Sequence, residues 1–418
     1  MKAFLKQIVK VVKKDDPELA KLIEQEILRQ EKTINLIPSE NVVPLSMLGA
    51  IATPLMNKYS EGYPEKRYYP GNVYNDQIEL LAQKRAKKLF NLKDDWGVNV
   101  QSYSGSPANM AVYFGLLKPG ETVMGMNLAA GGHLTHGHKV NFSGKFYNSV
   151  QYGVNEKTGL IDYDALEKLA MKYKPRLIIS GYTAYPRKID FKKINQIAKK
   201  VGAYHLADIS HIAGLVAAGV HPSPFKDSDV VMMTTHKTLR GPRGAVIFAK
   251  AELMAQIDKA VFPGLQGGPH NNITAAKALA FYLDKKPGFT SYSKQIIKNA
   301  KTLADELKKN GFTLLTGGTD NHLMLIDLRP LGLEGKEAEK ILENAGILAN
   351  RNSLPADLKP FNPSGIRLGT PAITSRGFKE KEMKQIATWF KQLLIEKQNP
   401  GKIEKEVIRL CKKFPLPY

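Results

Sequence analysis

Strand-like and helix-like segments alternate through the middle of this 418-residue chain. Short apolar runs typical of strands occur at 98–100, 122–126, 177–180, 204–208 and 229–234. Helical patterns lie between several of these runs, and the clearest, Phe191 to Val201, has one apolar face and ends at Gly202. Parallel strands need crossover connections, usually helices, and such sheets are covered on both faces. The alternation therefore predicts an α/β fold built on a mostly parallel sheet.

The pattern changes after about residue 275. A long helical stretch containing Pro287-Gly288 leads into several strand-like runs, a helix that stops at Gly346 and a last helical region. These runs lie at 312–316, 322–328, 347–351 and 365–370. The mixture predicts a smaller α+β domain. We divide the chain into an N-terminal helical arm (1–45), a large α/β domain (46–275) and a small C-terminal α+β domain (276–418).

Two N-terminal segments differ in character. The apolar residues of 4–12 repeat at helical spacing and are interrupted by lysines, which predicts a surface helix rather than a secretory signal. A helix lying on a membrane is the alternative. Asp15-Asp16-Pro17 predicts the start of a second helix. Residues 33–75 are rich in Pro, Gly, Asn and Tyr without periodicity, so we expect an irregular segment that is functional or wraps a partner subunit.

Composition limits the class of protein. No apolar run approaches the ~20 residues that a membrane helix needs, so no membrane span is expected. The single cysteine, Cys411, cannot form an intrachain disulfide, which fits a cytoplasmic location. The net charge of +22 raises the question of nucleic acid. Because the lysines are scattered along helices without a nucleic-acid-binding motif, we expect a solvated basic surface, or a field that attracts small anions.

Lys237 lies at a corner between two strand-like runs, and Asp208 ends another such run. A lysine amine can hold an aldehyde as an imine, and a carboxylate can keep a pyridine nitrogen protonated so that the ring takes up electrons. These are the two groups that pyridoxal phosphate needs. A solvated surface lysine is the alternative interpretation.

Ser104-Gly105-Ser106-Pro107 follows the strand-like run at 98–100. We expect Ser106 to cap a helix and Pro107 to occupy its first position, which would create an anion site of backbone N–H groups. His236, beside Lys237, is a candidate second phosphate contact. An ordinary capped helix is the alternative.

Three histidines, His133, His136 and His138, lie within six residues. No cysteine or acid is close in the sequence, and the flanking glycines give no helix to present the rings together, so we predict no metal site. His133 is instead a candidate to stack on a flat cofactor. His211 follows Asp208, either as a structural histidine or as an imidazole near the cofactor ring.

Arg367 lies between Gly365 and Gly369 in a strand-like run. Strand arginines usually face solvent. An arginine flanked by small residues can instead reach into a cleft and hold a carboxylate with two hydrogen bonds.

Together these residues resemble the serine hydroxymethyltransferase family, from about Lys32 to the C-terminus. The specific motifs are Asn57 to Pro64, Lys66 to Tyr69, Gly125 to Leu128, Gly131 to Gly137, Thr234 to Thr238, Gly267 to Pro269 and Gly317 to His322. The resemblance implies a fold-type-I pyridoxal-phosphate transferase. It implies reversible conversion of serine and tetrahydrofolate, or a related pterin, to glycine and the methylene-pterin through a Schiff base (aldimine) on the cofactor.

The resemblance also implies roles for individual residues. Lys237 would form the Schiff base, Asp208 would pair with the pyridine nitrogen, and His133 would stack on the ring. Other cofactor contacts would come from Ser104, Gly105, Ser106, Thr183, His211, His236 and Tyr59, with Gly267 and Gly268 from the neighbouring subunit of a homodimer. Glu61, Tyr68 and Thr234 would join Lys237, Asp208 and His133 as catalytic residues. Arg367 and Ser39 would bind the amino-acid carboxylate, and the other substrate-binding residues would be Glu61, Tyr68, Tyr69, Leu128, Gly132, Leu134 and Asn352.

Several positions depart from the commonest family pattern without removing a reacting group. They are Pro38, Tyr103, Thr183, Met232, Met233 and Leu265. Two other functions remain open. A pterin-independent β-hydroxy-amino-acid aldolase would share Lys237, Asp208 and Arg367 but would not need a pterin pocket. A nucleic-acid-binding protein on an inactive copy of the fold would not need those three residues.

Overall fold

The computed structural model describes residues 3–355, 357 and 362–418. These residues form two compact units. Unit 1 contains the described residues of 1–45, 295–352 and 361–418, and unit 2 contains those of 46–294 and 353–360. The three-part division at residues 45 and 275 stays a prediction about domains. In the structure residue 275 lies inside helix α11 (Asn271–Asp284).

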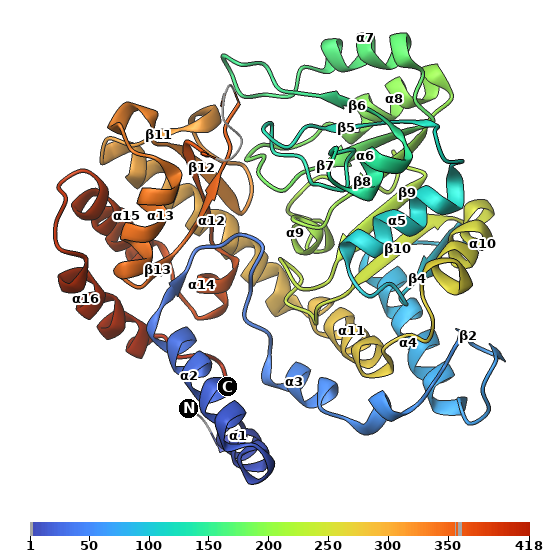
Figure 1. The fold of residues 1–418 in the computed structure, drawn as a ribbon, viewed down its shortest axis with the longest axis horizontal. Helices are drawn as coiled ribbons and strands as arrows, with labels where there is room; N and C mark the ends of the chain where they lie inside the picture. The colour runs from blue at the N-terminus through green and yellow to red at the C-terminus, as the bar shows by residue number, and fades with distance from the viewer. Residues whose placement is uncertain (1–2, 356, 358–361) are drawn as a thin grey trace. The chain divides into compact units, whose positions relative to one another are not determined.

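A seven-stranded sheet forms the middle of unit 2 (Figure 1). Its strands are β4 (Trp96–Asn99), β5 (Thr122–Met126), β6 (Asn148–Tyr152), β7 (Leu177–Gly181), β8 (Tyr204–Asp208), β9 (Val230–Thr234) and β10 (Ala245–Lys250). They lie in the order β4-β10-β9-β8-β7-β5-β6. Strands β9, β8, β7, β5 and β6 pair in parallel, whereas β10 is antiparallel to both β9 and β4. The prediction of an α/β fold with a mostly parallel sheet is confirmed.

Helices cover this sheet in the way that buried parallel strands require. Helix α5 (Gly105–Leu116) packs on β9 and β10, and α10 (Ala251–Lys259) packs on β10 and β4. Helix α8 (Phe191–Val201) packs on β7 and β8, and α7 (Tyr163–Tyr173) packs on β6. Helix α4 (Val73–Leu89) lies against α11. Every residue of β7 and β9 is buried, so side chains at the ends of these strands are held by a rigid core.

Unit 1 is built on a four-stranded antiparallel sheet in the order β11-β12-β15-β14. The strands are β11 (Thr313–Leu314), β12 (Leu323–Asp327), β14 (Asn350–Asn352) and β15 (Gly365–Gly369). The helices that lie wholly in this unit are α1 (Ala3–Asp15), α2 (Pro17–Lys32), α13 (Gly335–Asn344), α14 (Pro371–Ser375), α15 (Glu380–Leu394) and α16 (Pro400–Lys413), and most of α12 (Pro287–Lys309) also belongs to it. Apolar side chains from α12, α13, α15, α16 and the sheet form its core.

The N-terminal helices begin as the sequence predicts. Asp16 is the N-cap of α2, and its side chain accepts a hydrogen bond from the backbone N–H of Leu19 at 2.9 Å. The long helical stretch with Pro287 is corrected: Pro287 opens a separate helix, α12 (Pro287–Lys309), after α11 has ended. Proline lacks the N–H that a helix interior needs but is tolerated in the first turn.

As far as Asn72 the segment 33–75 contains only short elements, as its composition indicates, and α4 begins at Val73. The short elements are β1 (Ile34–Asn35), which pairs with β13 (Ile347–Leu348), then α3 (Leu45–Ile51), a 3-10 turn (Pro54–Asn57), β2 (Gly62–Tyr63) and β3 (Lys66–Arg67). Unit 2 also contains the short helices α6 (Phe142–Phe146) and α9 (Ala213–Ala217). Within the described part of the chain, the search for a helix with the length and apolar character of a membrane span finds none.

Candidate active site

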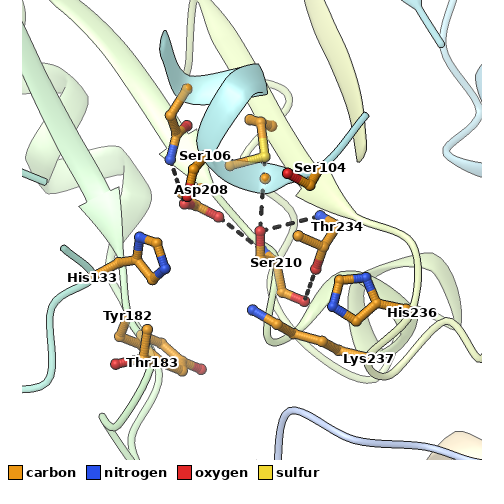
Figure 2. A pocket seen from close by; sticks show the side chains of 13 residues that line it. Ser104, Ser106, His133, Tyr182, Thr183, Asp208, Ser210, Thr234, His236 and Lys237 are labelled. Atoms are coloured by element: carbon orange, nitrogen blue, oxygen red, sulfur yellow. Dashed lines mark hydrogen bonds between the residues drawn. The ribbon is translucent and has the colours of Figure 1, made fainter. Parts of the chain in front are cut away.

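Lys237 and Asp208 lie at the ends of two neighbouring parallel strands. Asp208 is the last residue of β8 and pairs with Met232 of β9, and Lys237 follows the end of β9 by three residues. Both line a cavity of about 240 Å³ (Figure 2). The cavity is lined by Ser104, Gly105, Ser106, Asn109, His133, Tyr182, Thr183, Asp208, Ser210, Met232, Thr234, His236 and Lys237. The Lys237 side chain is only 9% exposed, so it is not an ordinary surface lysine.

Three groups hold the carboxylate of Asp208. Asn109 Nδ2 donates to Asp208 Oδ2 at 3.0 Å, and the backbone N–H of Ser210 donates to Oδ1 at 3.0 Å. His136 Nε2 lies 3.1 Å from Oδ2. Burial raises the pKa of Asp208, but the hydrogen bond and charge of His136, with smaller contributions from His133 and Ser210, hold the pKa below its ordinary value. The carboxylate is therefore ionised at neutral pH although it is buried.

A chain of hydrogen bonds connects Asp208 to the ring of His133. Asn109 Nδ2 also donates to Thr135 Oγ1 at 2.8 Å, and Thr135 Oγ1 lies 2.7 Å from His133 Nδ1. The ring of His133 therefore has a fixed orientation at one side of the cavity, facing the space in front of Asp208 and Lys237 (Figure 2). A flat ring held in this way can stack on a planar ligand.

The N-terminus of α5 forms another wall of the cavity. Ser104 is the N-cap of this helix and Gly105 is its first residue, which corrects the expectation that Ser106 caps and Pro107 begins the helix. Ser104 has an extended backbone (φ −159°, ψ 177°), and the helical conformation begins at Gly105. The Ser104 side chain makes no capping hydrogen bond. First-turn N–H groups lack partners within a helix, so this end favours an anion.

His236 lies beside this helix end and is largely buried. Burial, together with the positive charges of Lys237 and Arg243, lowers the pKa of His236 to about 3. The imidazole is therefore neutral at physiological pH. A neutral imidazole can donate one hydrogen bond without adding a charge.

The remaining predicted cofactor residues of this region divide into two groups. Thr183 and Thr234 line the cavity, and Thr183 Oγ1 donates to the carbonyl of Gly132 at 2.9 Å. His211 is buried next to Ser210 and is not one of the lining residues.

The sequence did not single out Asn109, Ser210 and Tyr182 as site residues, or His136 as a partner of Asp208. Asn109 was detectable, because it lies one helical turn after Gly105 and shares its face of α5.

Tyr59, Gly267 and Gly268 line a different cavity of unit 2. This second cavity, of about 560 Å³, also contains Tyr103, Met56, Lys58 and residues 269–273. Glu61 is close to it, because a Cβ atom added to Gly267 would lie 3.1 Å from Glu61 Oε1. The aromatic rings of Tyr59 and Tyr69 are 5.1 Å apart, and Tyr68 packs edge-on against Phe262. No described residue lines both cavities.

Arg67 anchors the segment that carries these tyrosines. Its guanidinium pairs with Asp76 at 2.8 Å and with Glu79 at 2.6 Å, and it donates to the carbonyls of Ser60 and Gly62. The Arg67 side chain is 4% exposed. A planar cation with five donors can hold two carboxylates and two carbonyls at once, so this irregular segment has a defined shape.

Leu128, Gly132 and Leu134 belong to the loop that follows β5. Leu128 and Leu134 are partly exposed. A Cβ atom at Gly132 would lie 1.9 Å from the carbonyl oxygen of Met126, so only glycine fits there. This loop also carries His133, so the two leucines lie on either side of His133 in the sequence.

Arg367, Ser39 and Asn352 belong to unit 1. Arg367 lies at the centre of β15, and its Nε donates to Asn350 Oδ1 at 3.1 Å. Burial lowers the pKa of Arg367 to about 10, so the guanidinium stays charged at neutral pH. The backbone N–H of Gly369 donates to the carbonyl of Leu36, which brings the turn containing Ser39 to the end of β15. Asn352 ends β14, the neighbour of β15.

Among residues 3–355, 357 and 362–418 there is no group of three His, Cys, Asp or Glu side chains that could hold a metal ion. A comparison with protein-family models matches residues 12–390 to the model described as serine hydroxymethyltransferase. This match covers most of the chain and agrees with the fold and with the lysine and aspartate at the strand ends. The chain therefore belongs to the serine hydroxymethyltransferase family, whose members are fold-type-I, pyridoxal-phosphate-dependent glycine hydroxymethyltransferases of one-carbon metabolism.

Proposed function

We propose that this enzyme interconverts serine and glycine, with tetrahydrofolate or a related reduced pterin as the carrier of the one-carbon unit. The observation that supports this most is the shared cavity of Lys237, Asp208 and His133 at the ends of neighbouring strands. A pterin-independent aldolase could share those three residues, so the choice between the two activities depends on the residues outside this cavity.

The residues of the first cavity fit pyridoxal phosphate. Two buried polar atoms that line it, Asn109 Oδ1 and His236 Nδ1, have no hydrogen-bond partner in the described structure. Gly105 allows the start of α5 to approach Thr234 closely, because a Cβ atom at this position would lie only 2.8 Å from Thr234 Cγ2. This cavity is lined by a lysine amine, an ionised carboxylate and a helix N-terminus. These three groups can bind the aldehyde, the pyridine nitrogen and the phosphate of pyridoxal phosphate, respectively.

Bound pyridoxal phosphate supplies an aldehyde for amine exchange and a ring that takes up electron density from the substrate α-carbon. We propose that Lys237 holds the cofactor covalently and that Asp208 keeps a proton on the pyridine nitrogen. His133 would stack on the ring. The buried charge of Asp208, maintained by His136, supports its role because an ionised carboxylate is needed opposite a protonated nitrogen.

The helix N-terminus would bind the phosphate. We assign this contact to Ser104, Gly105, Ser106 and the neutral imidazole of His236. Thr183 and His211 would face the phenolic oxygen of the cofactor.

Unit 1 would bind the amino-acid carboxylate. Arg367 is proposed as the residue that grips it, with help from Ser39. A guanidinium that stays charged in a buried strand supports this role, because it can form two parallel hydrogen bonds to a carboxylate.

Glu61 and Tyr68 would transfer protons and face the pterin, with Tyr69 nearby, and Thr234 would be a further catalytic residue. The pterin pocket would include Leu128, Gly132, Leu134 and Asn352. Exposed leucines in the loop after β5 support the pterin proposal, because a flat heterocycle needs apolar contacts.

We propose a homodimer in which each subunit completes the site of the other. Tyr59, Gly267 and Gly268 line a separate cavity in their own chain, so they would reach the cofactor of a partner. Large exposed apolar side chains between residues 56 and 81 support such an interface. They are Met56, Tyr59, Tyr68, Tyr69, Val73, Tyr74, Leu80 and Leu81. An apolar surface of this extent is characteristic of a protein–protein contact.

Glu61→Gln tests the pterin-dependent function. Glutamine preserves the shape but cannot carry the catalytic proton. We expect the variant to bind serine normally and to lose most pterin-dependent formation of glycine. Cleavage of allo-threonine, which needs no pterin, should change less. Equal loss of both reactions would show that Glu61 acts in a step that does not involve the pterin, and parental turnover of serine with pterin would remove Glu61 from the mechanism.

A mixed dimer of Lys237→Ala and Glu61→Ala chains tests the shared site. If sites are shared, one of the two sites collects both defects and the other has neither, so mixing two inactive proteins should restore activity. Confirmed subunit exchange without recovery would show that each chain builds its own site.

We further propose that the enzyme acts in the cytoplasm, on small molecules rather than nucleic acid, and that 46–275 is its cofactor-binding domain. All residues that line the first cavity lie between 104 and 237, which supports this assignment. A nucleic-acid-binding protein on an inactive fold would have no need for a buried lysine and carboxylate in one cavity.

A further inference from the structure

Lys277 is a buried lysine without a role in the reaction described above. It lies on α11, and its side chain is only 2% exposed. Its Nζ donates to three backbone carbonyls, those of Val100 at 2.6 Å, Ser102 at 3.0 Å and Ala245 at 3.0 Å. A buried charge is costly unless it is paired or fully hydrogen-bonded. These three carbonyls provide hydrogen bonds for Lys277, and the question is what the buried lysine does there.

The three acceptors match the ammonium form of the lysine. An ammonium group has three donors and no acceptor, whereas a neutral amine has only two N–H groups to offer three carbonyls. Burial lowers the pKa of Lys277 to about 7, and the negative charge of Glu79 acts in the opposite direction. Three carbonyl dipoles pointing at one atom also favour a positive charge there.

The carbonyls that Lys277 holds belong to the loop between β4 and α5 and to the residue that follows the loop between β9 and β10, and each of these loops has residues that line the first cavity. Val100 and Ser102 connect β4 to the phosphate-side residue Ser104, and Ala245 opens β10. The backbone N–H of Ala245 also donates to the carbonyl of Ser102 at 3.3 Å, so the two loops meet at this point.

The lysine also touches the loop of Lys237. A Cβ atom at Gly244 would lie 2.5 Å from Lys277 Cε, and the carbonyl of Gly244 accepts the backbone N–H of Thr235 at 3.0 Å. Thr235 precedes His236 and Lys237. The ammonium therefore lies where the phosphate-side loop and the lysine loop are joined.

We propose that Lys277 is a built-in monovalent cation: its ammonium fills a site of three carbonyl oxygens and holds these two loops in the geometry that binds the cofactor. Carbonyl oxygens are the ligands that replace water around K⁺, and NH₄⁺ can donate N–H groups to them as the lysine ammonium does. Removal of the side chain should therefore leave a site that an added monovalent cation can fill. Lys277 is on this view a positioning residue, since it touches neither cofactor nor substrate.

The test compares Lys277→Ala, Lys277→Met and the control Lys285→Ala, which removes an exposed lysine at the end of the same helix. Full-length proteins are measured in choline chloride, KCl or NH₄Cl at equal ionic strength. For Lys277→Ala we expect cofactor affinity at least about tenfold weaker in choline, and recovery of most of this loss in KCl or NH₄Cl. Its thermal midpoint without cofactor should rise by about 3 °C or more on the same exchange.

The parent and Lys285→Ala should show no such difference between salts. Lys277→Met fills the space without a charge, so it should bind the cofactor weakly in every salt. A folded Lys277→Ala that responds equally to choline, K⁺ and NH₄⁺ would overturn the proposal. If Lys277→Ala does not fold, parental cofactor affinity in Lys277→Met would overturn it equally, because the charge would then be unnecessary.

Discussion

Replacement of Asp208 by asparagine preserves the size of a buried side chain and removes its charge. In the structure Asp208 Oδ1 accepts from the N–H of Ser210, and Oδ2 accepts from Asn109 and faces His136. An asparagine must place its NH₂ group on one of these two sides. On the first side it meets the Ser210 N–H, and on the second it meets the Asn109 donor, so one buried donor loses its acceptor in either orientation.

The magnitude follows from these contacts. A buried donor without a partner costs about 1–3 kcal/mol, so we expect Asp208→Asn to fold with an unfolding free energy lowered by that amount. Catalysis should suffer more. A preorganised group that stabilises developing charge contributes roughly 10²–10³-fold in rate, and the ionised carboxylate is the group proposed to keep the pyridine nitrogen protonated.

The assay is exchange of the glycine α-proton in D₂O, followed by NMR, because this step needs no pterin. Urea unfolding of the same samples gives the stability. We expect exchange to fall by at least about 100-fold while the cooperative unfolding transition is retained. Exchange within about tenfold of the parent, in a variant that binds the cofactor, would refute the electrostatic role of Asp208.

Three further changes test other parts of the structure. Arg367→Ala leaves a substrate carboxylate unpaired at a cost of about 3–5 kcal/mol, so serine should bind some hundreds of times more weakly; an affinity within a few-fold of the parent would remove Arg367 from the substrate site. Arg67→Met leaves the buried carboxylate of Glu79 without its cation, and urea unfolding should show a loss of about 3–5 kcal/mol, whereas a loss under 1 kcal/mol would mean that the pair is solvated. Burial raises the pKa of Asp258 from 3.8 to about 6, so the folded state binds the proton more tightly and stability falls as pH rises from about 4 to 6. Asp258→Asn should therefore be more stable than the parent at pH 7–8, by up to roughly 3 kcal/mol, with the gain lost near pH 4; the exposed control Asp94→Asn should show no such pH-dependent gain, and a parental pH profile in Asp258→Asn would contradict the assignment.

The elements predicted best from the sequence are those whose start, end and buried face are set by their own residues. Helix α8 matches its predicted range because its apolar face is regular, Asp190 caps its start and Gly202 ends it in a left-handed conformation. Strand β6 (Asn148–Tyr152) was missed because it lies at the edge of the sheet and only Tyr152 of its residues is buried. An edge strand needs few apolar side chains, so periodicity gives little signal.

The partners of the candidate site residues were harder to predict. His136 and Asp208 are 72 residues apart in the sequence, and nothing local to either histidine or aspartate indicates their pairing. Lys277 was overlooked because a lysine on a helix is usually solvated. The small side chains beside it, Ala275, Ala276 and Ala278, indicate that this part of α11 packs closely against other backbone.

The strand order explains why residues so distant in sequence meet at one edge of the sheet. In a parallel sheet, ligands bind at the carboxyl ends of the strands. The loops with His133, Thr183 and Lys237 follow β5, β7 and β9, and Asp208 is the last residue of β8; these four strands all run in one direction. Ser104 follows β4, which is separated from β9 by the antiparallel strand β10.

Two antiparallel pairings in succession restore the original direction, so the carboxyl end of β4 lies at the same edge as those of β8 and β9. Because β10 lies between β4 and β9, β4 keeps the direction of β9, and the helix N-terminus at Ser104 and Gly105 lies at the same edge of the sheet as Lys237. The same arrangement places the first residue of β10, Ala245, beside Ser102, and this is the junction that Lys277 holds. The three carbonyls come from the loop that follows β4 and from the first residue of β10, and on our proposal the ammonium of Lys277 supplies the donors that such buried carbonyls need.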